Sequence, residues 1–202
     1  MAEFENFGWN VLTLGFMGTI VFTVFEAWGL YRQKKKIWSE ESGKSVSVIM
    51  VAYTAALFTV MFIYGISVKK IAIVFNGGLL ALMCVPILRG LWKFKGFSKL
   101  EKRMSVVLAA AVAVMPFVPF KDWFFLTLTF GNVFSLLAQP YEIWKNKDAG
   151  AVEIRLWLVF LTSTFFWVLY AFSVNDWVMK IISPAYGVIN VLVIVLWLKY
   201  RR

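Results

Sequence analysis

The sequence predicts an all-α integral membrane protein, in which seven transmembrane helices form two parallel three-helix bundles joined by a linker helix (3+1+3). Three observations lead to this fold class. The chain of 202 residues is 61% apolar and its mean hydropathy is +0.75, whereas soluble domains are about 45–50% apolar. Its apolar residues form seven runs of roughly the length that crosses a bilayer. The first three of these runs resemble the last three.

The seven apolar runs define the expected spans, because a helix needs roughly 20 apolar residues to cross a hydrocarbon core about 30 Å thick. We expect the spans at 8–31, 46–66, 71–91, 104–120, 123–143, 156–174 and 178–198. The fourth span is the shortest, and Pro116 and Pro119 lie at its end.

The basic residues are distributed unevenly between the two sides of these spans. If the N-terminus lies outside, all but four of the 21 Lys and Arg residues fall on the cytosolic side. This asymmetry predicts an outside N-terminus and a cytosolic C-terminus in a multi-pass protein. It also accounts for the net charge of +10, so we expect the lipid bilayer and not a nucleic acid as partner.

Short motifs recur between the two halves of the chain. V-L-T-L-G-F at 11–16 matches F-L-T-L-T-F at 125–130, and F-I-Y-G-I-S-V at 62–68 matches V-L-Y-A-F-S-V at 168–174. Since one span separates the two halves, both halves cross the membrane in the same direction. Parallel repeats of this kind place a substrate site at their interface, near the middle of the membrane. The predicted domains are a first bundle at 1–95, a linker helix at 96–121 and a second bundle at 122–202.

Three motifs resemble those of a known transporter family. A-Q-P-Y-E-I-W-K-N-K at 138–147 resembles the P-Q-x-x-x-x-W-K-x-K signature of PQ-loop proteins, with Gln139 at the glutamine and Pro140 directly after it. F-F-W-V-L-Y-A at 165–171 resembles F-W-x-x-Y-G, and V-F-N-G-G at 74–78 resembles T-I-N-G-x-G. On these motifs the chain resembles the SWEET and SemiSWEET sugar facilitators of the PQ-loop superfamily.

The resemblance implies a set of substrate-binding residues. It places Trp167 at the aromatic residue that lines the sugar pocket and Asn76 at the asparagine that contacts sugar hydroxyls. The first half offers Met61 at the position of Trp167, and in the second half Asn190 lies further along the helix that corresponds to the one carrying Asn76. A neutral amide beside an aromatic plate suits a carbohydrate better than an ion, because the amide both donates and accepts hydrogen bonds.

Gate and hinge positions form a second set of candidates. Pro140 frees a backbone carbonyl deep in the fifth span and predicts a bend about one turn before the cytosolic loop. Glu26 is a carboxylate within the first apolar run, at a cost of roughly 2.5–3.5 kcal/mol if it lies at mid-bilayer. It is interpreted as a capped acid near the basic loop, a gate partner or a proton-titrating group. The candidate gate and hinge residues are Pro140, Gln139, Glu26, Tyr64 and Tyr170.

The function that we expect is facilitated transport of a mono- or disaccharide by alternating access. Two alternatives stay open: a proton-coupled PQ-loop amino-acid transporter, which Glu26 favours, and a PQ-loop membrane receptor. An enzyme is disfavoured because the chain has no histidine, a single cysteine at Cys84 and no paired carboxylates. We therefore expect no metal and no cofactor. The sequence leaves the solute, the coupling, the organelle and a homo-oligomeric state open.

Overall fold

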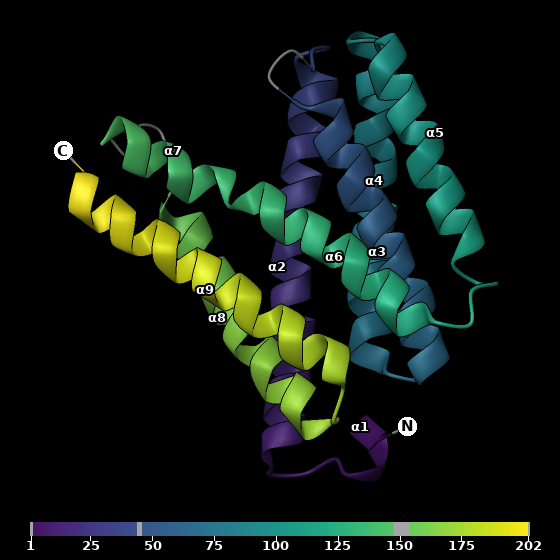
Figure 1. The fold of residues 1–202 in the computed structure, drawn as a ribbon, viewed down its shortest axis with the longest axis vertical. Coiled ribbons are helices and arrows are strands. Elements are labelled where there is room, and N and C mark those ends of the chain that lie inside the picture. Colours follow the sequence, from purple (N-terminus) through teal and green to yellow (C-terminus); the bar gives the residue numbers. More distant parts are fainter. Residues whose placement is uncertain (1, 44–45, 148–153, 202) are drawn as a thin grey trace. The chain divides into compact units, whose positions relative to one another are not determined.

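A computed structural model describes residues 2–43, 46–147 and 154–201 of the chain, and these residues fold into helices joined by short turns (Figure 1). Each expected span corresponds to a helix or to a pair of consecutive helices. The helices are α1 (Ala2–Glu5), α2 (Val11–Ser39), α3 (Val48–Val68), α4 (Ile71–Phe94), α5 (Lys99–Val114), α6 (Lys121–Leu136), α7 (Ala138–Asn146), α8 (Ile154–Ser173) and α9 (Trp177–Tyr200).

Four of the described helices, α2, α3, α4 and α9, are long and apolar enough to cross a membrane. A shorter apolar stretch, Trp157–Ser173, lies within α8. Large apolar side chains are exposed along these helices, for example Leu82 and Val85 on α4 and Val24 on α2. Exposed apolar side chains in such number indicate contact with lipid rather than with water.

The chain divides into two compact units. Unit 1 contains Thr23–Phe125, and unit 2 contains Ala2–Phe22 and Leu126–Arg202. The long helix α2 therefore contributes residues to both units, and so does α6.

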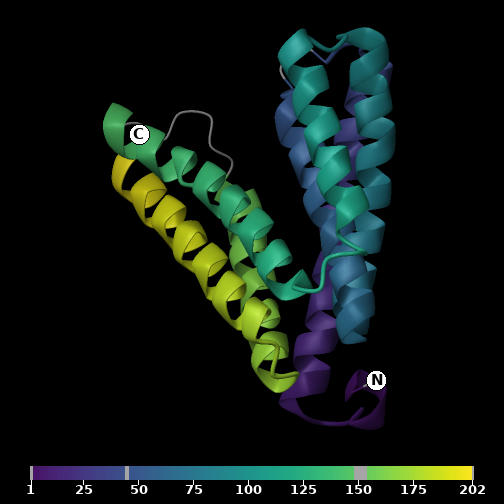
Figure 2. The same cartoon turned by 45° about the vertical axis from the view of Figure 1, so that its right-hand side comes forward.

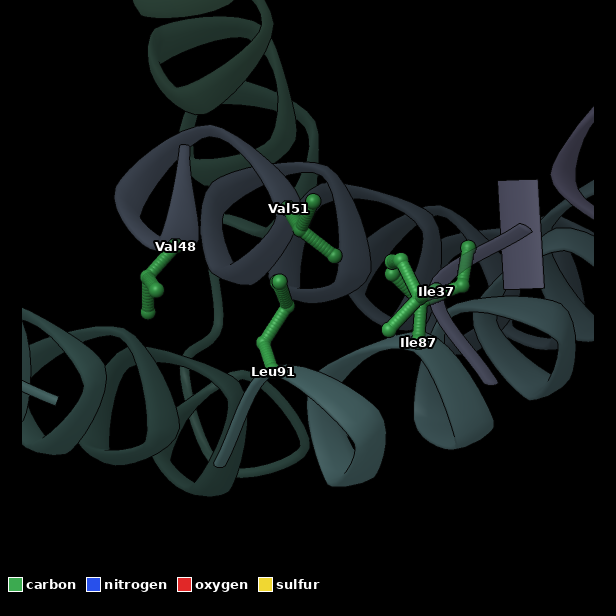
Figure 3. Close-up of a cluster of buried hydrophobic side chains, with 5 residues drawn as sticks. All are labelled: Ile37, Val48, Val51, Ile87 and Leu91. Atoms are coloured by element: carbon green, nitrogen blue, oxygen red, sulfur yellow. The ribbon is translucent and has the colours of Figure 1, made fainter. Parts of the chain in front are cut away.

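In unit 1, α3 lies beside α4 and also packs against α5 (Figures 1 and 2). The end of α2 joins them through an apolar cluster, whose members point toward one another in Figure 3. The cluster consists of Ile37, Val48, Val51, Ile87 and Leu91. Next to this cluster the indole nitrogen of Trp38 donates a hydrogen bond of 3.0 Å to the carbonyl oxygen of Pro86. These contacts fix the C-terminal end of α2 to α3 and α4.

In unit 2, α9 packs against α8 and α7. Their shared core is an apolar cluster that includes one residue of α6. The cluster consists of Val133, Ile143, Trp157, Ile189 and Val193. At the other end of the unit, Gly15 of α2 lies against the backbone of α8, where an added Cβ would be 2.7 Å from the amide nitrogen of Tyr170. A side chain at this position would force α2 away from α8, so the glycine permits the close approach of the two helices.

The fourth span differs from the prediction in its bounds. The run 104–120 predicts a helix that starts at Met104, but α5 begins at Lys99 and ends at Val114. The early start follows from a capping box, in which Ser98 and Glu101 satisfy each other's backbone N–H groups. The early end coincides with Pro116, which has no N–H to donate to the carbonyl of Val112, while Met115 before it still has helical dihedrals.

The fifth span is interrupted. The run 123–143 predicts one bent helix, and the structure has α6 up to Leu136 and α7 from Ala138, separated by the single residue Leu137, which keeps helical dihedrals with φ of −63° and ψ of −19°. The interruption at Leu137 lies three residues before Pro140. Pro140 has no N–H to donate to the carbonyl of Leu136, and its ring crowds that carbonyl. The proline therefore explains why the helix is interrupted one turn before it.

The internal repeat is visible in two turns. Lys69, between α3 and α4, and Asn175, between α8 and α9, both have left-handed backbone conformation, with φ of 56° and 51°. In each turn the next residue donates its N–H to a carbonyl five residues earlier, at 3.0 Å from Lys70 to Gly65 and at 3.1 Å from Asp176 to Ala171. The two turns are 106 residues apart, which is the offset of the motifs at 62–68 and 168–174.

Candidate functional site

In unit 1, the amide of Asn76 lies in a small polar cluster between two apolar helices. Asn76 is on α4 and is 3% exposed. Its Nδ2 donates a hydrogen bond of 2.8 Å to Oγ1 of Thr23 and one of 3.2 Å to Oε2 of Glu26. Thr23 and Glu26 are three residues apart on α2 and so share one face of that helix. The structure thus brings together Asn76, expected to bind substrate, and Glu26, expected at a gate.

This cluster has a defined hydrogen-bonding capacity. Both bonds use the amide nitrogen of Asn76, so they leave the amide oxygen to accept from another donor. The half-buried Glu26 carboxylate accepts one of these bonds. Because unpaired polar groups are costly in an apolar environment, the three side chains hold one another at fixed positions on α2 and α4.

Met61 and Tyr64 lie one turn apart on α3, also in unit 1. Both are buried, at 7% and 1% exposure. The ring of Tyr64 stacks on that of Phe125, with the centroids 4.7 Å apart. Tyr64 is therefore held by an aromatic contact with the first turns of α6.

In unit 2, Trp167 and Tyr170 form a buried aromatic pair on α8. They are 9% and 0% exposed, and their rings meet edge to face with centroids 5.9 Å apart. The hydroxyl of Tyr170 donates a hydrogen bond of 2.6 Å to Oε1 of Glu3, which is 1% exposed. The short helix α1 is thereby attached to the end of α8 by a buried hydrogen bond.

Asn190 is the second buried amide and lies on α9 of unit 2, at 5% exposure. Its Nδ2 donates a hydrogen bond of 3.1 Å to Oγ1 of Thr164 on α8. Thr164 precedes Trp167 by three residues, so the two lie on the same face of α8. Trp167 therefore lies on the same face of α8 as Thr164, which accepts the hydrogen bond from Asn190 of α9. Each unit thus contains a buried amide that donates to a threonine hydroxyl.

The buried faces of α4 and α9 agree at the offset of 106, but their amides do not. At that offset Ala72, Ile73 and Ile87 correspond to Val178, Met179 and Val193, all of which are buried. Asn76 then corresponds to Ile182, and Asn190 corresponds to Cys84. When the two halves are aligned at this offset, the positions of the two amides differ by eight residues, or roughly 12 Å along a helix.

Pro140 and Gln139 lie in the first turn of α7. Pro140 is buried and Gln139 is half-buried. The core cluster of unit 2 includes Ile143, one turn further along α7, so the turn after the interruption at Leu137 is fixed by packing on α9.

The sequence interpretation missed the residues that complete these contacts. Thr23, Thr164 and Glu3 were not selected, nor was the hydrogen bond of 2.8 Å from the hydroxyl of Tyr186 to Oδ1 of Asn132. Threonine is common in apolar helices, where its hydroxyl bonds to its own backbone, so its type alone is no signal. The spacing of Thr23 and Glu26 was a usable signal, because a polar pair three residues apart marks one helix face.

Comparisons with known proteins identify the fold. Residues 122–202 match the sequence model of a family described as sugar efflux transporters for intercellular exchange. None of the curated proteins matches the chain. The structure is similar to that of a eukaryotic SWEET transporter solved at 3.7 Å resolution, with a TM-score of 0.79 and 12% sequence identity. This similarity covers 94% of the present chain and 96% of that transporter.

These comparisons confirm the predicted fold class and the resemblance that the three motifs indicated. The chain is an integral, multi-pass membrane protein with the all-α, seven-helix fold of SWEET transporters. The matching family is one of transporters and not of enzymes, in agreement with the expectation from the sequence.

Proposed function

We propose that the chain is a facilitator that moves small neutral sugars, mono- or disaccharides, across a membrane by alternating access. The observation that carries this proposal is the burial of two amide–hydroxyl pairs, Asn76 with Thr23 and Asn190 with Thr164, in predominantly apolar helices. The match of residues 122–202 to a family of sugar efflux transporters supports the same substrate class.

The chemistry of the site suits a neutral polyol. A sugar that leaves water loses hydrogen bonds, and each group left unsatisfied costs several kcal/mol in a membrane. The Asn76 amide oxygen accepts from a sugar hydroxyl, and its nitrogen exchanges a bond to Thr23 for one to the solute. Trp167 covers the C–H face of a sugar ring and donates through its indole N–H. Met61, at the corresponding position of the first repeat, supplies a second apolar wall.

The proposal includes a gating role for four further residues. The interruption at Leu137 provides a point at which α7 changes its direction relative to α6, and Pro140 prevents the continuous hydrogen bonding that would remove it. Gln139 lies beside Pro140 and moves with it. Tyr64 and Tyr170, which occupy equivalent positions in the two repeats, are the other two gate residues of the proposal.

We also propose the topology and the domain boundaries. The N-terminus faces outside and the C-terminus faces the cytosol, because most of the Lys and Arg residues lie at the ends of α2, α4, α7 and α9, at the starts of α5 and α8, and in the short segments beside them. The first bundle comprises residues 1–95, the linker helix 96–121 and the second bundle 122–202.

A second candidate function is proton-coupled transport of an amino acid, and the hydrogen bond between Asn76 and Glu26 favours it. Protonation of Glu26 would replace an acceptor next to the substrate amide by a donor. Glu26→Gln should then abolish any dependence of uptake on pH, while a facilitator should show the same pH profile in both proteins.

Transport in proteoliposomes tests the proposal. The purified protein is assayed for exchange of labelled glucose, sucrose and neutral amino acids, and sugars alone should be exchanged. Asn76→Ala and Thr23→Val should lower sugar exchange by about 5- to 100-fold, since the loss of a hydrogen bond to a buried group costs about 1–3 kcal/mol. The control is Thr162→Val, because the Thr162 hydroxyl bonds to the backbone of its own helix. Exchange of amino acids but not sugars would refute the proposal.

A further inference from the structure

One end of unit 1 is strongly basic. In the segments 32–43 and 89–103, ten Lys and Arg residues are accompanied by only three Glu residues. The basic residues are Arg32, Lys34, Lys35, Lys36, Arg89, Lys93, Lys95, Lys99, Lys102 and Arg103. The acidic ones are Glu40, Glu41 and Glu101.

Contacts within unit 1 bring these segments together. Trp38, near the end of α2, lies edge to face against Phe94, near the end of α4, with centroids 5.5 Å apart. Lys93 lies over both rings, with its Nζ 5.6 Å and 4.9 Å from their centroids. Helix α5 begins only a few residues after α4 ends (Figure 1). The ends of α2 and α4 and the start of α5 therefore form one basic surface.

An apolar groove leads from this surface along α3, α4 and α5. Its volume is about 430 Å³. Small side chains, among them Ala52 and Ala55 of α3 and Ala109 of α5, leave it open, and Trp92 and Phe97 line it near the basic end. Lys102 joins the two features, because its Nζ lies 5.5 Å from the ring centroid of Trp92.

The groove contains a polar atom whose hydrogen bonding is incomplete. Ser105 lines the groove one turn after Lys102, and its Oγ is buried without a hydrogen-bond partner among the described residues. A buried hydroxyl in this state costs free energy unless a ligand supplies the partner. Lys99, Lys102 and Ser105 are spaced by three residues and therefore follow one face of α5.

Glu101 is the acidic residue at the start of α5, and its carboxylate does not point its charge at the groove alone, because it is hydrogen-bonded within its own helix. The carboxylate of Glu101 accepts a hydrogen bond of 2.8 Å from the backbone N–H of Ser98, within the capping box. Hydrogen bonds from the backbone and the side chain of Ser98 keep the pKa of Glu101 below its ordinary value. The carboxylate is thus committed to the start of its own helix, and Lys102, whose Nζ lies over the ring of Trp92, brings positive charge to the mouth of the groove.

We propose that this groove binds one anionic glycerophospholipid. An acyl chain lies along the alanine-lined wall, the phosphate is held by Lys99 and Lys102, and the hydroxyl of Ser105 donates to an oxygen of the glycerol ester. Charge complementarity selects this occupant, since clustered basic residues next to a membrane span attract anionic headgroups, whereas a neutral lipid would use only the apolar wall. The proposal is independent of the transported solute.

Lipid binding to the intact protein in detergent tests the proposal. Native mass spectrometry counts the lipids retained per chain when phosphatidylserine or phosphatidylcholine of equal chain length is added. Phosphatidylserine should be retained preferentially, with one tightly bound molecule per chain. Lys99→Gln/Lys102→Gln should weaken its binding by roughly 25-fold, because each basic residue near an anionic surface contributes about 5-fold. The matched control Lys145→Gln/Lys199→Gln removes two charges from unit 2 and should have no such effect.

A second pair of variants separates the groove from the charge. Ala109→Phe fills the groove without changing any charge and should displace the lipid, whereas Ala110→Phe adds the same ring to a neighbouring residue that does not line the groove. Thermal unfolding of both variants establishes that they are folded.

Three results would overturn the proposal. Equal lipid retention by the Ala109 and Ala110 variants would show attraction to the surface without a seated lipid. Equal retention of phosphatidylserine and phosphatidylcholine would show a neutral lipid in the groove. Displacement of the lipid by soluble glycerophosphoserine would show a site for the free phosphate group.

Discussion

Gly77 gives the sharpest prediction for the packing of unit 1. It lies on α4 directly after Asn76, where the backbone of α3 comes closest. A Cβ added at this position would be 2.4 Å from the amide nitrogen of Phe62 and 2.7 Å from the carbonyl oxygen of Phe58. Both are backbone atoms, so no side-chain rotation relieves the clash. Gly77→Ala therefore requires α3 and α4 to move apart.

The magnitude follows from these distances. Nonbonded heavy atoms reach their optimum at about 3.5 Å, so the helices must separate by about 1 Å at their closest point. Overpacking of this kind costs about 1–3 kcal/mol, while alanine regains about 1 kcal/mol of helix propensity over glycine. We expect Gly77→Ala to lower the free energy of unfolding by up to about 2 kcal/mol, and Tm by up to about 8 °C for a chain of this size.

The chain supplies both the reporter and the control for this experiment. Cys84 is the single cysteine, lies on the same helix and is fully buried, so a thiol-reactive fluorogenic dye reports the opening of α4 on heating. Gly29→Ala is the matched control, because a Cβ at Gly29 meets nothing within 4 Å. It should leave Tm unchanged or raise it slightly. Equal Tm values for the two variants would refute the close approach of α3 and α4.

Three further predictions concern the hinge, the N-terminal helix and the start of α5. Pro140→Ala should leave Tm within a few degrees of the wild type but slow sugar exchange in proteoliposomes; unchanged exchange would contradict the hinge. Tyr170→Phe should lower the free energy of unfolding by about 1–3 kcal/mol, because it leaves the buried carboxylate of Glu3 without the phenol donor; thermal melts against Tyr200→Phe measure this. The advantage in Tm of the wild type over Glu101→Gln should be present at neutral pH. It should vanish as the pH falls below the ordinary glutamate pKa of 4.5, because the pKa of Glu101 is lowered in the folded state.

The positions of the helices could be predicted from the sequence because each helix that crosses a bilayer needs an apolar run of roughly the same length. Apolar runs located all seven spans, and the repeat of F-I-Y-G-I-S-V located two turns of equal conformation. The structure departs from the predicted bounds of the fourth span, and divides the fifth, for local reasons. At α5 the capping box of Ser98 and Glu101 outweighed the apolar pattern, and at Leu137 the missing N–H of Pro140 interrupted the helix one turn earlier than the proline itself.

The sequence indicated individual residues of the candidate site but not the contacts between them. Asn76, Trp167 and Asn190 are all buried, and their partners depend on how each helix is rotated about its axis. An apolar helix that faces lipid on one side and protein on the other has little hydrophobic contrast around its circumference, so its sequence does not fix that rotation. The pairing of Asn76 with Glu26 across α2 and α4 therefore depends on the rotation of these two helices and not on any motif.

The repeat preserves backbone geometry and not polar chemistry, and this distinction has a physical basis. A turn such as that at Lys69 or Asn175 is fixed by left-handed backbone conformation and main-chain hydrogen bonds, which many sequences satisfy. A buried amide is fixed by the side chains to which it donates, so its place along a helix depends on where those partners lie. Asn76 pairs with Thr23 of α2, whereas Asn190 pairs with Thr164 of α8, and the two amides consequently occupy different turns of equivalent helices. Exchanging residues at equivalent positions, as in Cys84→Asn with Asn76→Ile, should therefore fail to restore sugar exchange, because position 84 has no counterpart of Thr164 supplied by the repeat.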